Sequence, residues 1–212
     1  VSGFHGRTMG AQLAGGDPSA KQWIAEDRQH FVQVPFPDGF RCTNTDFDQF
    51  EEQLTAQGVK PEQVALVLME SYQGGGASFA PEPYVKALRA WCDRHDVLLA
   101  MDEVQAGFGR TGRFFAFEHY GITPDLITCG KAISGSLPLS AVIGPAHLLD
   151  QYPPGSMTST HGGNTPACAA ALAHLDVLLK ENLTKRSASE GVGFGDGLQA
   201  LAKRYPFIAA VH

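Results

Sequence analysis

Two side chains whose types suit catalysis stand at the ends of two apolar runs. The run 98–101 ends at the acid Asp102, and the run 126–129 is followed by Gly130 and Lys131. Such runs predict buried strands, and parallel strands would bring the acid and the amine to one sheet edge. A lysine can hold a carbonyl cofactor as a Schiff base, while an acid keeps a pyridine nitrogen protonated as an electron sink. The pair therefore fits pyridoxal phosphate chemistry.

The elements that must position this pair can be predicted from apolar spacing. A helix over 83–95, which opens with proline, separates two of the apolar runs, and this strand–helix–strand order predicts a right-handed crossover and a parallel sheet. The predicted strands are 64–69, 97–101, 126–129 and 139–144, and the further predicted helices are 46–57, 166–179 and 191–203. Residues 10–45 predict irregular surface structure. The class is α/β.

Polar residues gather at the carboxyl ends of the predicted strands. Glu70 follows the first strand, 102–105 follow the second, and Gly130 and Lys131 follow the third. Ligands in open α/β sheets bind beyond these ends. We therefore expect the functional site at this edge.

Composition limits the classes of function. The chain has 212 residues, 43% hydrophobic and 18% charged, which suits one globular domain. A net charge of −6 argues against nucleic-acid and membrane-surface partners, and no membrane span or signal peptide is predicted. The cysteines form no C-x-x-C pair and His161 has no second histidine at ligand spacing, so no disulfide or metal site is expected. Reduced cysteines suit a cytoplasmic enzyme.

Five sequence blocks occur in an order typical of one family. They are Phe4-His5-Gly6-Arg7-Thr8, 70–76, 101–112, 124–131 and 159–164. Together they resemble the class III (omega) aminotransferases, which are fold-type I enzymes dependent on pyridoxal 5'-phosphate. The resemblance implies a three-layer α/β/α fold with a mostly parallel sheet. Residues 1–212 would form the large cofactor-binding domain, truncated at both ends and without the C-terminal small domain.

The resemblance also implies an activity. The parent enzyme would move an amino group from an amine or ω-amino acid to an oxo acid, through a Schiff base on Lys131 and a pyridoxamine phosphate intermediate. Lys131 would also shuttle a proton between the substrate α-carbon and the cofactor, and Asp102 would pair with the pyridine nitrogen. Arg7 would grip a substrate carboxylate, for which a guanidinium suits.

The remaining implied contacts fix the cofactor ring and its phosphate. Val104 would pack on one ring face and Phe4 on the other, Gln105 would hydrogen-bond the phenolic oxygen, and His5 and Glu70 would border the cofactor. Thr160 would contact the phosphate from the neighbouring subunit, so a homodimer is expected.

Each assignment has a simpler alternative. Asp102 could cap a helix, and Lys131 could be a solvated surface lysine. Phe4 and Val104 could be core residues, and Arg7 could form a structural salt bridge. The glycines of 107–112 lack the spacing of a phosphate loop and predict turns.

The chain departs from the family in three ways. Gly75 stands where many members have the glutamate that pairs with a C-terminal arginine, which weakens the case for 4-aminobutyrate or ornithine as substrate. The phosphate-binding turn would lie before residue 1 and the small domain beyond His212. We therefore expect this chain alone to bind cofactor weakly and to transaminate little.

Other functions remain open. A decarboxylase, aminomutase or racemase of the same fold would keep Asp102 and Lys131. A catalytically silent fragment or interaction module would keep the fold without chemistry. A nucleotide-binding protein is a third possibility, which the missing phosphate-loop motifs disfavour.

Overall fold

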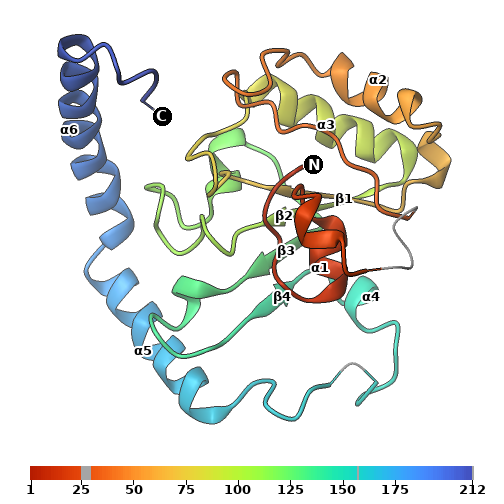
Figure 1. Ribbon diagram of the computed structural model, residues 1–212. Coiled ribbons are helices and arrows are strands. Elements are labelled where there is room, and N and C mark those ends of the chain that lie inside the picture. Colours follow the sequence, from red (N-terminus) through yellow and green to blue (C-terminus); the bar gives the residue numbers. More distant parts are fainter. Residues whose placement is uncertain (25–29, 157, 212) are drawn as a thin grey trace.

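A mixed sheet forms the centre of the molecule. The computed structural model describes residues 1–24, 30–156 and 158–211 (Figure 1). In these ranges one sheet has the order β1-β2-β3-β4. The strands are β1 (Leu66–Glu70), β2 (Leu98–Asp102), β3 (Leu126–Cys129) and β4 (Ala141–Ile143). The first three are parallel and β4 is antiparallel to β3. The predicted strands and their parallel arrangement are confirmed, and residues 25–29 of the segment expected to be irregular lie outside the described residues.

The helices follow the predicted pattern, with three differences. The elements are α1 (Met9–Ala14), α2 (Asp48–Ala56), α3 (Glu82–His95), α4 (Ala146–Leu149), α5 (Thr165–Lys180) and α6 (Leu183–Arg204). No apolar spacing predicted the short helix α4. Helix α1 falls in the segment 10–45 expected to be irregular, so that expectation was wrong there. Helix α6 begins eight residues before the predicted start at 191, because its first two turns are polar and give little apolar signal.

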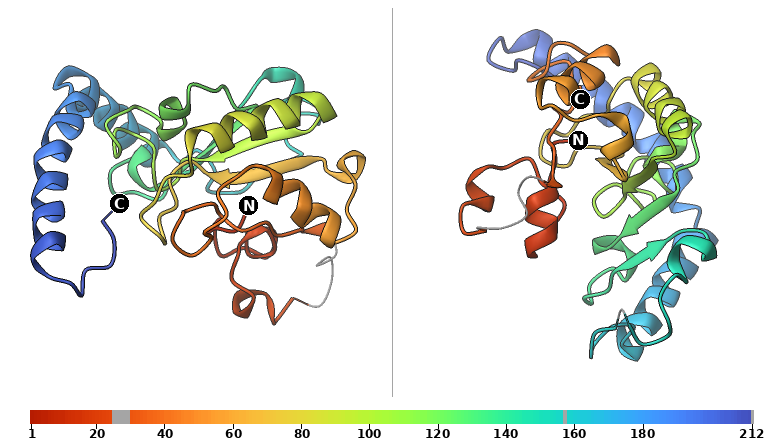
Figure 2. Two further views of the ribbon diagram at one scale, coloured as in Figure 1. Left: turned by 90° about the horizontal axis from the view of Figure 1, so that it is seen from above. Right: turned by 90° about the vertical axis from the view of Figure 1, so that its right-hand side faces the viewer.

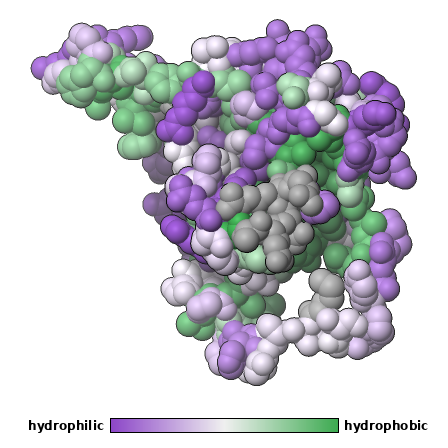
Figure 3. Space-filling model, turned by 45° about the vertical axis from the view of Figure 1, so that its right-hand side comes forward, coloured by the Kyte–Doolittle hydropathy of each residue, from purple (hydrophilic) through white to green (hydrophobic). Residues whose placement is uncertain are grey.

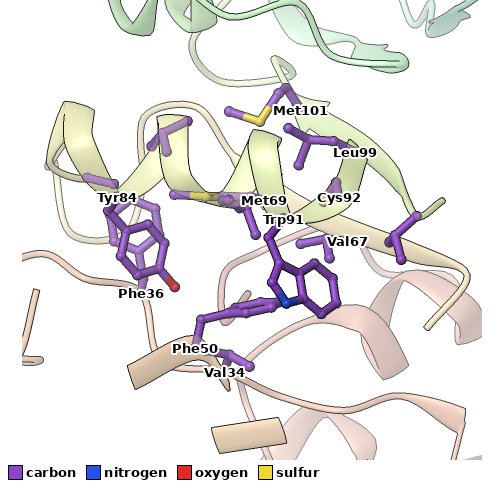
Figure 4. Close-up of a cluster of buried hydrophobic side chains, with 14 of the residues drawn as sticks. Val34, Phe36, Phe50, Val67, Met69, Tyr84, Trp91, Cys92, Leu99 and Met101 are labelled. Carbon is purple, nitrogen blue, oxygen red and sulfur yellow. The ribbon is translucent and has the colours of Figure 1, made fainter. Parts of the chain in front are cut away.

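The main core lies between the sheet and helices α2 and α3. Alternate residues of the strands, such as Val67, Met69, Leu99 and Met101, point toward α3 (Figure 4). They meet buried Tyr84 and Trp91 of α3 and Phe50 of α2. The intervening strand residues, which include Glu70 and Asp102, therefore face the other side of the sheet.

That other side carries the N-terminal segment. Figure 2 shows α1 and the residues before it on the side of the sheet opposite α3. The expected α/β class, with a mostly parallel sheet and helices on both sides, is thus confirmed. Within the described ranges, no helix is both long and apolar enough to cross a bilayer.

Helix α6 projects from the body and carries exposed apolar side chains. Figure 3 shows apolar colour on this projecting end, where Val192, Phe194 and Leu201 are exposed. In the described part of the chain this apolar face is uncovered.

Candidate functional site

The carboxylates at the ends of β1 and β2 are adjacent. Glu70 and Asp102 pair in the parallel register, so both side chains lie on the sheet face opposite the core. The N-terminal segment crosses them. The backbone N–H of Phe4 donates to Oε1 of Glu70 at 2.8 Å, and Nδ1 of His5 lies 2.7 Å from Oδ2 of Asp102. Two consecutive residues of this segment are thus tied to two neighbouring strands.

Asp102 is buried and held in one orientation. Its Oδ2 contacts His5, and its Oδ1 accepts the backbone N–H of Val104 at 3.0 Å. The residues after Asp102 form turns, so the helix-cap alternative is wrong. Each carboxylate oxygen can accept a second hydrogen bond. Asp102 therefore keeps acceptor capacity for a further donor such as a pyridinium N–H.

Glu70 braces two loops. Its Oε1 accepts from Phe4, and its Oε2 accepts the backbone N–H of Gly74 at 2.9 Å. A Cβ on Gly3 would lie 2.6 Å from Oε1 of Glu70, so a larger residue there would require the Glu70 carboxylate to shift. These contacts give Glu70 a structural task, and its contact with a cofactor stays a prediction.

Lys131 follows β3 as the first residue of the 3₁₀ helix η5 (Lys131–Ile133). Its side chain is exposed, and its amine has no hydrogen bond or ion pair among the described residues. Its backbone is left-handed, with φ of 40°. This conformation costs a non-glycine residue about 1–2 kcal/mol and persists only where the surroundings impose it. A merely solvated surface lysine would not require such strain.

The loop after β2 connects the loops after its two neighbours. Val104 packs against the backbone of Gly130, where a Cβ would lie 3.2 Å from its Cγ1. The exposed side chain of Gln105 packs against Gly74, where a Cβ would lie 2.8 Å from its Cγ. The predicted residues of 102–105 thus lie between those at Glu70 and at Lys131.

Phe4 and Arg7 lie at the surface of this site. The Phe4 ring is 56% exposed, so the core alternative is wrong for this residue. The guanidinium carbon of Arg7 lies 5.7 Å from the ring centroid, which is a cation–π contact. Phe4 thus presents an exposed aromatic ring next in sequence to His5, the partner of Asp102.

Thr160 stands apart from these residues. It is exposed in a turn before α5, and no described contact links it to Asp102 or Lys131. Its predicted role requires a second subunit and stays a prediction.

The residues present fit pyridoxal phosphate. Among the described residues, an oriented carboxylate, an exposed aromatic ring and an unpaired amine lie along one edge of the sheet, on Asp102, Phe4 and Lys131. These groups match a pyridine nitrogen, a flat ring and a carbonyl carbon in turn.

Sequence reasoning missed Glu103. This fully buried carboxylate accepts the backbone N–H groups of Ala116 and Phe117 at 2.9 and 2.8 Å. Burial raises the pKa of the Glu103 carboxyl, although these amides act in the opposite direction. Asp102 thus faces the site while its neighbour anchors the 3₁₀ helix η4 (Ala116–Tyr120). The signal was the strand alternation, which sends consecutive side chains to opposite faces.

A cavity of about 450 Å³ borders the site. Phe4, Glu70 and Gly75 form one part of its lining, and Asp38 and Arg41 form another. The side chain of Asp38 accepts the backbone N–H groups of residues 40, 41 and 42. Neither Asp38 nor Arg41 was singled out from the sequence, because no motif contains them.

Comparison with known proteins identifies relatives along the whole chain. The model of the aminotransferase class-III family matches residues 1–212. The 5-aminovalerate aminotransferase DavT of Pseudomonas putida is 44% identical over 161 residues, which are 76% of this chain and 38% of that protein. The probable 4-aminobutyrate aminotransferase of Bacillus subtilis is 36% identical over 219 residues, 99% of this chain and 50% of that protein. The chain thus spans at most about half the length of these relatives.

Solved structures of aminotransferases also match nearly the whole of this chain. The ornithine aminotransferase of Toxoplasma gondii superposes with a TM-score of 0.85 at 32% identity, over 99% of this chain and 48% of that one. An (S)-enantioselective omega-transaminase from Thermomicrobium roseum gives a TM-score of 0.84 at 31% identity, over 95% and 48%. Another structure of the Toxoplasma gondii enzyme is described with partial occupancy of PLP at its active site. This chain belongs to the class-III aminotransferase family.

Proposed function

We propose that this chain supplies the cofactor-binding part of a pyridoxal phosphate-dependent transaminase, which transfers an amino group from an amine or ω-amino acid to an oxo acid. The observation that supports the proposal is that the strand ends leading to Asp102 and Lys131 share one sheet edge, to which Phe4 is tied through Glu70. Family membership supports it. The donor, the acceptor and the activity of the whole protein belong to the proposal, because the chain spans only part of its relatives.

The chain's own residues divide the work. When bound, the cofactor supplies an electron sink for the electrons released at the substrate α-carbon. Lys131 would hold the cofactor covalently and, once displaced by substrate, would move a proton at that carbon. Asp102, oriented by His5, would keep a proton on the ring nitrogen. Phe4 and Val104 would fix the plane of the ring from its two faces.

Substrate and subunit contacts complete the proposal. Arg7 would bind a carboxylate of the substrate by a bidentate contact, and Gln105 would hydrogen-bond the phenolic oxygen of the cofactor. In a homodimer, Thr160 would contact the phosphate of the cofactor held by the partner subunit. Its exposed position leaves it accessible for that contact. The four free cysteines suit a reduced, cytoplasmic location.

Borohydride trapping tests the cofactor site. The full-length protein is incubated with pyridoxal phosphate, reduced and mapped by mass spectrometry. We expect one adduct at Lys131, absent in Lys131→Ala and retained in Lys180→Ala, an exposed lysine paired with Asp176. Adducts spread over surface lysines would refute the assignment. The same assay on residues 1–212 should show weaker labelling.

Product analysis separates transamination from related chemistry. Oxo-acid formation without carbon dioxide release is expected from a transaminase, whereas carbon dioxide would indicate a decarboxylase. Inversion at the carbon that bears the amino group would indicate a racemase, and migration of the amino group to another carbon of the same molecule would indicate an aminomutase. Labelling at Lys131 without any of these products would favour a catalytically silent module.

A further inference from the structure

The histidine of helix α5 lies against the turn that carries Lys131. A Cβ on Gly135 would lie 3.3 Å from Nδ1 of His174 and 3.9 Å from its Cγ, so the imidazole packs on the backbone of Gly135. Helix α5 is in contact with η5, as its path beside the loop after β3 shows (Figure 1). No motif or predicted role included His174.

The turn that contacts this ring, residues 130–135, contains two residues with a left-handed backbone. Lys131 has φ of 40° and Gly135 has φ of 75°, so both ends are left-handed. Two short-range hydrogen bonds close it, from the N–H of Ile133 to the oxygen of Gly130 at 3.0 Å and from the N–H of Gly135 to the oxygen of Ala132 at 3.3 Å. Such backbone conformations persist where the surroundings hold them.

Two side chains from other elements press on this turn. Val104 contacts Gly130 at its start, and His174 contacts Gly135 at its end. The first comes from the loop after β2 and the second from α5. Lys131 lies between Gly130 and Gly135 in sequence, so the two contacts hold the turn on both sides of it.

The side chain of His174 acts by packing and not by hydrogen bonding. Its Nε2 is buried and has no hydrogen-bond partner among the described residues. An apolar residue in this alanine-rich helix would avoid leaving a buried nitrogen unsatisfied. The ring therefore contributes through its packing contact with Gly135 and not through a hydrogen bond of Nε2.

We propose that His174 is a positioning residue, whose ring holds the turn 130–135 in the conformation that presents the amine of Lys131. The proposal rests on the proposed function only in taking Lys131 as the reactive amine. The geometry of the turn can be measured without cofactor.

Hydrogen exchange and amine acylation of the cofactor-free, full-length protein test this role. In His174→Ala we expect the amides of Ile133 and Gly135 to exchange about tenfold faster, because local opening of the turn becomes easier. The rate at which an acylating reagent modifies Lys131, relative to Lys180, should change with it. Leu172→Ala is the matched control, because Leu172 lies on the same helix and is 69% exposed.

A double-mutant cycle tests the contact itself. Gly135→Ala combines strain at φ of 75° with a Cβ that presses on the ring, so it should disturb the turn. In the His174→Ala background the ring is absent, so Gly135→Ala should accelerate exchange of the turn amides by a smaller factor. Additive effects of the two substitutions would overturn the contact.

Either of two results would overturn the proposal. Wild-type exchange of the turn and wild-type Lys131 reactivity in a folded His174→Ala protein would overturn it. If that variant does not fold, His174→Leu keeps apolar volume without the flat ring, and it should fold with faster exchange of the turn. Wild-type exchange in His174→Leu would equally overturn the proposal. Failure of wild-type Lys131 to be trapped with cofactor would sink the proposed function but leave these measurements valid.

Discussion

The imidazole of His5 and the carboxylate of Asp102 lie 2.7 Å apart, with side-chain exposures of 2% and 6%. The two residues are 97 positions apart in sequence, and they bring the N-terminal segment onto the end of β2. The neighbouring contact from Phe4 to Glu70 does the same at the end of β1. The segment that carries Phe4 and Arg7 is therefore fixed by the strand ends.

Replacement of His5 should show how much its contact with Asp102 contributes to the free energy of unfolding. His5→Ala leaves a buried carboxylate oxygen of Asp102 without its partner, so we expect unfolding to become easier by about 1–3 kcal/mol. His5→Asn keeps a donor near the position of Nδ1 and should recover part of the loss. Urea unfolding measures both. His147→Ala, at an exposed histidine of α4, is the control and should change little. Equal stability of His5→Ala and the wild type would contradict the role of this contact.

Gly130 should be sensitive to added bulk because Val104 occupies the adjacent space. In Gly130→Ala the new Cβ would lie 3.2 Å from Cγ1 of Val104 and would push the turn of Lys131 away. Overpacking of this kind costs about 1–3 kcal/mol, so cofactor trapping at Lys131 should weaken about tenfold.

The compensating substitution makes this prediction specific. Val104→Ala in the Gly130→Ala background removes the obstructing methyl groups and should restore part of the trapping. Gly75→Ala is the control, because a Cβ there meets nothing within 4 Å. Trapping in Gly130→Ala at the wild-type level would show that the turn tolerates displacement.

The buried carboxylate of Glu103 should matter for stability. Its two oxygens each accept one backbone N–H, so Glu103→Gln must turn an amide nitrogen toward Ala116 or Phe117. One buried N–H is then unpaired, and we expect a loss of about 1–3 kcal/mol in the free energy of unfolding. Glu118→Gln is the milder control, because Glu118 accepts a single N–H, that of Phe115, at an exposed position. Equal losses in the two variants would contradict the assignment.

The same residue gives a pH dependence with a defined sign. Burial raises the folded-state pKa of Glu103 above its usual value of 4.5. The folded state therefore binds a proton more readily than the unfolded state, and the stability from this group is lost as the pH rises through the folded-state pKa. The stability difference between wild type and Glu103→Gln should be largest below pH 4.5 and shrink as the pH rises through the folded-state pKa. A difference that grows with pH would contradict the raised pKa.

The local features of the site could be predicted from sequence, and the long-range ones could not. The apolar runs that end at Glu70, Asp102 and Cys129 identified the strands, because a buried parallel strand has little polar interruption. The short helix α1 gave too few turns for an apolar periodicity to register. The role predicted for Thr160 involves a second chain, which no pattern within one chain can place.

Most features of the site that the sequence did not predict are contacts between residues far apart in the chain. The pairing of His5 with Asp102 and that of Glu103 with the amides of η4 require the folded sheet to bring the partners together. Strand alternation predicts that Asp102 and Glu103 point to opposite faces, but not what each one meets there. Sequence therefore indicated the cofactor chemistry, and the structure adds the partners that orient Asp102 and Glu103.

Two buried tyrosines offer a matched test of how hydrogen bonds hold the site. The hydroxyl of Tyr120 donates to the oxygen of Ser71 at 2.6 Å and accepts the N–H of Ala80 at 3.2 Å, which ties the loop after β1 to η4. The equally buried hydroxyl of Tyr84 has no hydrogen-bond partner in the described part of the chain. Tyr120→Phe should therefore lower the free energy of unfolding by about 1–3 kcal/mol, whereas Tyr84→Phe should be neutral or stabilising. Thermal and urea unfolding of both variants measure the contrast, and an unchanged free energy of unfolding in Tyr120→Phe would show that ring packing alone, and not the Tyr120 hydroxyl, secures the loop.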